Sequence, residues 1–186
     1  MKSRFNLKLI FFIFIIMFFS SKSTKANYDK LFFDHSIKSI NGSIIDFNNY
    51  KNKAILLVNV ASYCGFTKQY YDLQQLWEEY QKKGLVVLGV PSKSFGQEKN
   101  NEEEIQKFCK VNFNITFPLT SIYDVKGDES HDIYKWAKRN YGKKAIPKWN
   151  FYKILINKEG MIEEVFSSFT NPNSEKVRKS IEKILN

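Results

Sequence analysis

Two unbroken apolar runs with a helical pattern between them restrict the fold of this chain more than any other feature. Residues 54–60 (AILLVNV) and 85–90 (LVVLGV) each have the length of a strand and the composition of one covered on both faces. Between the runs, large apolar side chains recur at helical spacing, namely Tyr70, Leu73, Leu76, Trp77 and Tyr80. Strand, helix and strand in this order predict a βαβ unit with parallel strands, and therefore an α/β fold.

The segments around this unit predict the rest of the domain. Thr67 is placed to cap the helix at 67–82, and Gly84 is placed to end it. Asn101 is placed to cap a second helix, which three glutamates favour and which should continue to about residue 111. Residues 31–36 and 42–47 predict an N-terminal β-hairpin around Asn41-Gly42. The remaining expectations are a strand at 117–122, a helix at 130–139, a hairpin of 151–156 with 161–166, and a helix at 174–185.

The first 26 residues differ from the rest of the chain. Three basic residues precede an unbroken apolar run at 9–19, which is too short to span a bilayer. A polar segment follows and ends in Thr24-Lys25-Ala26, which is typical of a secretory signal cleaved near Ala26. The prediction is therefore one domain at 27–186, exported to a periplasm or secreted, without stable membrane insertion after cleavage. A retained membrane anchor is the alternative.

Charge and composition exclude several classes of protein. The formal net charge is +10, but five of the 29 basic residues and none of the 19 acids fall within 1–26, which leaves about +5 for the domain. The lysines are scattered among acids and do not alternate with aromatic residues, so nucleic-acid binding is not expected. Two histidines, His35 and His131, form no cluster for zinc or haem, and no metal or other cofactor is predicted.

Cys64 is the candidate nucleophile because of its position. It follows the first buried strand and precedes the helix, at the edge of the sheet where open α/β proteins place their functional crevice. The positive end of a helix favours thiolate over thiol, and the thiolate is the nucleophile. Thioredoxin-like redox proteins carry a second cysteine where this chain has Thr67, so dithiol exchange at this turn is excluded. A lone thiolate suits attack on a peroxide, which yields a sulfenic acid that a second thiol must resolve. A buried structural cysteine is the alternative.

The segment around Cys64 resembles a known family. Residues 59–67 (NVASYCGFT) are similar to the peroxidatic-cysteine segment of the glutathione peroxidase family. Residues 84–91 (GLVVLGVP), 95–98 (FGQE), 117–118 (FP) and 148–151 (KWNF) resemble other landmarks of that family in order and approximate spacing. The resemblance covers roughly residues 31–185. It implies a thioredoxin-like fold, with a central mixed sheet flanked by helices, and a thiol peroxidase that reduces hydrogen peroxide and organic or lipid hydroperoxides.

The resemblance also implies the catalytic site. It assigns Cys64 as the attacking thiol and places Gln97, Trp149 and Asn150 around it. The two amides and the indole N–H can donate hydrogen bonds to the thiolate or to the leaving oxygen, which stabilises charge where it develops. The loop before Gln97 departs from the family, because residues 92–94 (SKS) replace Cys-Asn-Gln and one residue is missing. That departure puts the reach of Gln97 in question.

Cys109 matches the resolving cysteine of the thioredoxin-dependent branch of this family. It shares one face of its predicted helix with Ile105 and Phe108, so a buried structural cysteine is the alternative. A disulfide with Cys64 needs the two Cα atoms within about 7 Å, and we expect the helix around Cys109 to open during turnover. Cys109 also favours a thioredoxin-like protein over glutathione as the reductant.

The remaining expectations concern partners. The stretch between Lys138 and Lys148 lacks the insertion that tetrameric family members carry, which implies a monomer. A basic rim would attract an acidic partner, although solvated lysines are the alternative; it would consist of Lys68, Lys143, Lys144 and Lys148.

Three rival functions differ in what they require. A disulfide oxidoreductase needs a second cysteine at Thr67. A peroxiredoxin needs a proline in the loop before Cys64, and it leaves Trp149 and Asn150 unexplained. A redox sensor or relay that uses a Cys64–Cys109 disulfide switch shares the same thiol chemistry, and only the rate of peroxide turnover separates it from an enzyme.

Overall fold

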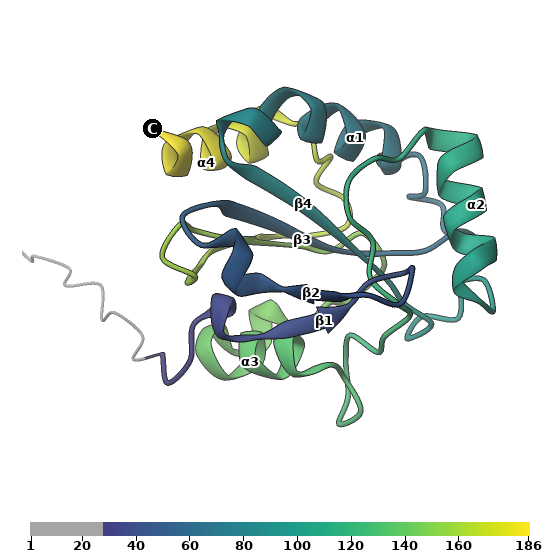
Figure 1. The fold of residues 1–186 in the computed structure, drawn as a ribbon, viewed down its shortest axis with the longest axis horizontal. Coiled ribbons are helices and arrows are strands. Elements are labelled where there is room, and N and C mark those ends of the chain that lie inside the picture. Colours follow the sequence, from purple (N-terminus) through teal and green to yellow (C-terminus); the bar gives the residue numbers. More distant parts are fainter. Residues whose placement is uncertain (1–27) are drawn as a thin grey trace, which may run out of the picture.

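A four-stranded mixed sheet forms the centre of the molecule in the computed structural model, which describes residues 28–186 (Figure 1). Its strand order is β4-β3-β5-β6. Strand β3 (Ala54–Val60) pairs parallel with β4 (Leu85–Pro91) and antiparallel with β5 (Lys153–Ile156), which pairs antiparallel with β6 (Ile162–Phe166). The predicted α/β class with a central mixed sheet is confirmed. The predicted secretory signal lies outside the described residues.

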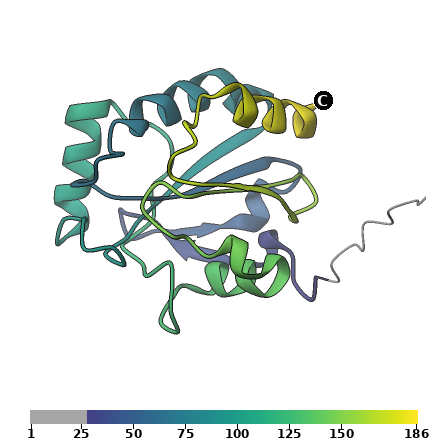
Figure 2. The same ribbon diagram turned by 180° about the vertical axis from the view of Figure 1, so that it is seen from behind.

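Helices cover both faces of this sheet (Figures 1 and 2). Helices α1 (Gln69–Tyr80) and α4 (Glu175–Leu185) lie on one face, and α3 (Asp132–Tyr141) lies on the other. Helix α2 (Glu102–Phe113) stands at one end of the sheet, and a small antiparallel sheet of β1 (Ser36–Lys38) and β2 (Ile44–Asp46) lies on the α3 side. None of the helices within residues 28–186 combines the length and the apolar composition needed to cross a membrane.

Two hydrophobic cores result from the covering of both faces. All seven residues of β3 are buried, and alternate side chains point to opposite faces, so Leu56 and Val58 enter one core while Ile55 and Leu57 enter the other. This is why the run at 54–60 is apolar throughout rather than alternating. The core under α1 and α4 also contains Cys64 and Cys109, which places both cysteines in one hydrophobic cluster.

Several local predictions are confirmed. The βαβ unit forms with a parallel strand pair, and Gly84 ends the α1 region with a φ of 105° after a short 3-10 turn (Gln81–Lys83). Asn101 caps α2, since its side chain accepts a hydrogen bond of 2.9 Å from the N–H of Glu104. The hairpin of β5 and β6 and the C-terminal helix lie where the sequence predicts them.

Three local predictions are wrong in part or in full. The N-terminal hairpin forms and turns through residues 39–43, but Phe32–Asp34 form a 3-10 turn, so its first strand begins only at Ser36. Residues 117–122 make only isolated bridges, Leu119 with Gly89 and Thr120 with Ser39. Pro118 has no N–H to donate to a continuous ladder, which explains the interruption. Thr67 does not cap α1, and its actual role is described below. The other 3-10 turns are Phe47–Tyr50 and Gly142–Ala145.

Candidate active site

Cys64 lies in a tight turn between β3 and α1, residues 61–67, which we call the cysteine turn. The Thr67 hydroxyl closes this turn, because it accepts a hydrogen bond from the Cys64 N–H at 3.1 Å and lies 2.7 Å from the Cys64 carbonyl and 3.0 Å from the Ala61 carbonyl. A hydroxyl engaged in this way cannot cap the helix, which corrects the role predicted for Thr67. The cysteine itself is 8% exposed.

The sulfur of Cys64 has a backbone donor next to it. The N–H of Phe66 points at Sγ with a separation of 3.4 Å. An N–H donor at sulfur stabilises negative charge there, as does the start of helix α1 that follows the turn. The turn therefore holds a thiol that is almost covered and has a backbone donor at its sulfur.

Gln97 and Asn150 meet in the structure. The Asn150 amide, which is fully buried, donates a hydrogen bond of 2.9 Å to Gln97 Oε1. The Gln97 carbonyl in turn accepts from the N–H of Tyr63 at 2.9 Å, which ties the Gln97 loop to the cysteine turn. The shortened loop therefore still brings Gln97 to the Asn150 amide. The Asn150 Oδ1 atom is buried and has no hydrogen-bond partner among the described residues.

Trp149 lies at the surface beside this pair. Its side chain is 41% exposed, and its ring is tilted against Phe95 with ring centroids 5.3 Å apart. Within residues 28–186 neither the Trp149 indole nor the amides of Gln97 and Asn150 donate a hydrogen bond to Cys64 Sγ. Hydrogen bonds of this kind often form only once a substrate is bound.

Asn59 is a site residue that the sequence reasoning missed. Its side chain donates to the Trp149 carbonyl at 3.1 Å and accepts from the Tyr152 N–H at 3.1 Å, and its carbonyl accepts from the Phe151 N–H at 2.6 Å. Phe151 has a φ of 61°, a conformation that side chains other than glycine seldom adopt. Asn59 thus holds the bend that carries Trp149 and Asn150. The available signal was one polar residue inside an otherwise apolar strand.

Glu98 is a second residue that the sequence reasoning missed. Its Oε1 atom accepts from the N–H groups of Ser62 at 3.0 Å and Lys99 at 2.8 Å, so it joins the cysteine turn to the Gln97 loop. Burial raises the pKa of Glu98, although these hydrogen bonds lower it. Its Oε2 atom is buried without a partner in the described part of the chain.

Cys109 lies inside α2 and is 1% exposed. Burial raises the pKa of Cys109 to about 11; the adjacent Tyr70 hydroxyl acts to lower it and the Glu98 carboxyl to raise it. Cys64 and Cys109 are both free thiols in this structure. The predicted helix face is confirmed, because Ile105 and Cys109 are buried and Phe108 packs against the same core.

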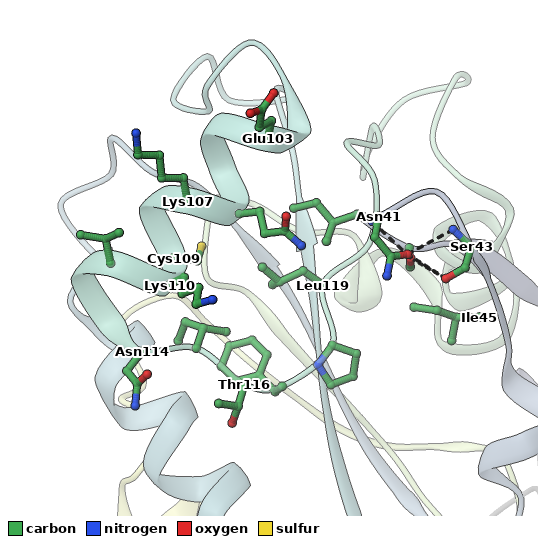
Figure 3. A pocket seen from close by; sticks show the side chains of 17 residues that line it. Asn41, Ser43, Ile45, Glu103, Lys107, Cys109, Lys110, Asn114, Thr116 and Leu119 are labelled. Atoms are coloured by element: carbon green, nitrogen blue, oxygen red, sulfur yellow. Dashed lines mark hydrogen bonds between the residues drawn. The ribbon is translucent and has the colours of Figure 1, made fainter.

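A large groove lies on the other side of α2 and not at Cys64. It has a volume of about 740 Å³ and runs between α2, the turn of the N-terminal hairpin and the segment after α2 (Figure 3). Its walls include Cys109, Lys110, Asn41 and Thr116. None of Cys64, Gln97, Trp149 and Asn150 lines it. This groove is therefore separate from the four predicted catalytic residues.

Comparisons with known proteins identify the family of this chain. The family described as glutathione peroxidase matches residues 32–138. Glutathione peroxidase-like peroxiredoxin 2 of Saccharomyces cerevisiae is 42% identical over 148 residues, which cover 77% of this chain and 91% of that protein. A glutathione peroxidase of Lactococcus lactis is 37% identical over 158 residues, or 83% of this chain and 99% of the relative. The crystal structure of T. cruzi GPX1 has a TM-score of 0.66 at 28% identity, covering 84% of this chain and 97% of that one.

Proposed function

The chain belongs to the glutathione peroxidase family, and we propose that Cys64 is the thiol through which it reduces hydroperoxides. It is a peroxidase, an oxidoreductase that reduces peroxides with a thiol. One observation supports the assignment to Cys64. Gln97 accepts a hydrogen bond from the Asn150 amide, and its carbonyl accepts another from the Tyr63 N–H in the cysteine turn. Polar groups capable of donating hydrogen bonds are thereby gathered around the turn that holds the nucleophile.

The first step is a displacement at oxygen. The Cys64 thiolate attacks one peroxide oxygen, the O–O bond breaks, and the sulfur is oxidised to a sulfenic acid. The leaving oxygen takes a proton and departs as water or an alcohol. Gln97, Asn150 and Trp149 are the groups we assign to stabilise the charge on that oxygen, through amide and indole N–H donors. None of them has to change its protonation state.

The second step uses Cys109. Its thiolate attacks the Cys64 sulfur, the S–O bond breaks, and hydroxide leaves as water with one proton, which gives a Cys64–Cys109 disulfide. Since Cys109 is buried within α2, we infer that this helix opens before the bond can form. A dithiol protein of the thioredoxin type then reduces the disulfide, with glutathione as the alternative donor. The exposed side chains of Lys68, Lys143, Lys144 and Lys148 support an acidic partner.

The location and assembly of the protein are also proposals. The segment at 1–26 supports export with cleavage near Ala26, which would leave a peroxidase domain at 27–186 in a periplasm or outside the cell. The short connection after α3, which passes directly into the turn Gly142–Ala145, supports a monomer.

Peroxide consumption tests the central proposal. The wild-type chain should consume hydrogen peroxide and an organic hydroperoxide with thioredoxin or glutathione supplied, whereas Cys64→Ser should lose turnover by at least a thousandfold. Absence of turnover by the wild type with every pairing would refute the peroxidase.

Peptide mapping tests the role of Cys109. Protein treated with one equivalent of peroxide should yield a linked Cys64–Cys109 peptide. Oxidised Cys64 without that link would remove Cys109 from the cycle. A linked peptide without multiple turnovers would instead favour the redox sensor, in which the disulfide changes the binding of a partner.

A further inference from the structure

A surface turn near the cysteine is held from below by buried polar side chains. This turn, residues 167–170, joins β6 to α4 on the face of the sheet that α1 covers (Figure 2). Lys153 in β5 is 0% exposed, and its ammonium donates to the carbonyls of Ser167 at 3.2 Å and Thr170 at 2.5 Å. Gln69 donates to the Ser168 carbonyl at 2.7 Å. Three of the four carbonyls of the turn are therefore fixed.

Burial of the Lys153 ammonium beneath this turn, taken by itself, destabilises the folded protein. Burial lowers the pKa of Lys153 to about 7, and the carboxylate of Asp72 only partly opposes that effect. A buried amine of this kind is rare in proteins unless it is paired or has a specific role. Simple closure of a surface loop does not require it, because the turn already has its own hydrogen bond from the Thr170 N–H to the Ser167 carbonyl.

The turn presents a phenylalanine beside the cysteine turn. Phe169 is 85% exposed, and its ring stands edge-on to Phe66 with ring centroids 5.2 Å apart. Phe66 is the residue whose N–H donates to Cys64 Sγ. Gln69, which holds the turn, lies in the first turn of α1, directly after the cysteine turn. Gln69 and Phe66, which contact the turn at 167–170, thus lie within five residues of Cys64 in the sequence.

We propose that Phe66 and Phe169 form an apolar wall that binds the hydrocarbon part of an organic hydroperoxide, and that Lys153 is the positioning residue that holds this wall beside Cys64. This inference rests on the proposed function of Cys64. Hydrogen peroxide has no hydrocarbon part and does not use the wall. The wall therefore affects selectivity between peroxides and leaves the displacement at oxygen unchanged.

Steady-state kinetics of the full chain with cumene hydroperoxide and hydrogen peroxide test the wall. Phe169→Ser should raise KM for cumene hydroperoxide about tenfold, which is the effect expected from losing apolar contact with much of one ring. Its kcat/KM for hydrogen peroxide should not change. Ile44→Ser is the matched control, since Ile44 is 67% exposed on β2, in the small sheet on the α3 side of the molecule (Figure 1). This variant should change KM and kcat for neither peroxide.

The role of Lys153 is tested by combining variants. Lys153→Met should reproduce the selective rise in KM for cumene hydroperoxide, and the double variant with Phe169→Ser should be no worse than Phe169→Ser alone. Equal losses for both peroxides would show that Lys153 only stabilises the fold. If Lys153→Met does not fold, Gln69→Met removes the contact to Ser168 and should give the same selective effect.

The outcomes separate this inference from the proposed function. Equal peroxide consumption by wild type and Cys64→Ser would refute the role of Cys64. If the wild type reduces both peroxides and Phe169→Ser reduces cumene hydroperoxide with unchanged kcat/KM, the wall is overturned while the role of Cys64 stands.

Discussion

The turn that carries Cys64 and the helix that carries Cys109 share one hydrophobic core but treat their thiols in opposite ways. Around Cys64 the backbone is bent so that the Phe66 N–H points at the sulfur. Cys109 lies within a regular helix, where every nearby N–H is used by the helix itself, and burial raises its pKa to about 11. The turn thus places a donor at the sulfur of Cys64, whereas the helix interior makes the thiol of Cys109 difficult to ionise.

The difference also concerns what each region can do without unfolding. The cysteine turn is held by hydrogen bonds to Thr67 and Glu98 and by the Tyr63 N–H, which donates to the Gln97 carbonyl. Helix α2 buries Ile105 and Cys109 and packs Phe108 and Phe113 against the same core, so these contacts must be broken before Cys109 is exposed. This contrast fits the roles that we propose for Cys64 and Cys109.

The largest expected effect is on kcat/KM, when a polar group proposed to act with Cys64 is removed. Asn150→Ala should lower kcat/KM for hydrogen peroxide by about 10²- to 10³-fold, because it removes one donor at the developing charge and frees Gln97 from its partner. Asn140→Ala is the control, since the Asn140 amide only donates to the Trp136 carbonyl on α3. A peroxidase rate unchanged in Asn150→Ala would show that these amides do not act on the reaction.

The low reactivity of Cys109 should depend on the fold. At pH 8 only about one Cys109 in a thousand is ionised, given its pKa of about 11, against about one in ten at its ordinary value of 9.0. Iodoacetamide should therefore label Cys109 about 100 times faster in 8 M urea than in the native protein, as followed by mass spectrometry of tryptic peptides. In the native protein Cys64 should be labelled faster than Cys109. Equal rates in the native protein would contradict the contrast between turn and helix.

Stability at alkaline pH should report on Cys109. Its pKa is raised from 9.0 to about 11 by burial, so the unfolded chain loses this proton first as pH rises. The stability that it contributes is complete below pH 9 and is lost between pH 9 and 11, by about 2 to 3 kcal/mol at most. Buried tyrosines such as Tyr70 and Tyr134, whose pKa values are also raised by burial, add a loss of their own toward pH 11. Urea unfolding should therefore show a loss in wild type and Cys64→Ala that is larger than the loss in Cys109→Ala by the contribution of Cys109. The same slope in all three proteins would assign it to other groups.

The smallest expected effect is on the opening of α2. Asn101→Ala removes the cap of this helix, which should destabilise it by about 1 kcal/mol and speed formation of the Cys64–Cys109 disulfide about fivefold. Ser174→Ala is a matched control, because Ser174 is at the N-cap of α4 but its side chain makes no capping hydrogen bond. Samples quenched at intervals after one equivalent of peroxide give the rate. A slower rate in Asn101→Ala would mean that the intact helix delivers Cys109.

The elements that the sequence predicted best are those with local causes. The runs at 54–60 and 85–90 are buried on both faces. Such burial requires apolar residues throughout a strand, and this composition can be recognised in the sequence. The Asn101 cap acts over three residues and was predicted for the same reason. The predicted strand at 117–122 is reduced to isolated bridges because Pro118 has no N–H for a ladder, and its one contact with β4 depends on Gly89, where a side chain would collide with Leu119.

The candidate site was proposed in part from the sequence. Cys64 became the candidate nucleophile through its position between a buried strand and a helix, and Gln97, Trp149 and Asn150 became candidates through the resemblance to the family; their catalytic roles stay predictions. Asn59 and Glu98 could not be assigned roles, because their partners lie 90 and 36 residues away in the chain. Lys153 could not be distinguished from a surface lysine until the structure showed its ammonium beneath residues 167–170.

The sequence by itself determined the α/β class, the βαβ unit and the candidate nucleophile, because hydrophobic patterning and helix capping depend on residues close together in the chain. Only the tertiary structure decided that the amides of Gln97 and Asn150 meet, that Cys109 has a raised pKa and that Phe169 lies next to Phe66. Hydrogen bonding and desolvation depend on groups that folding brings together from distant segments, and no local pattern contains them.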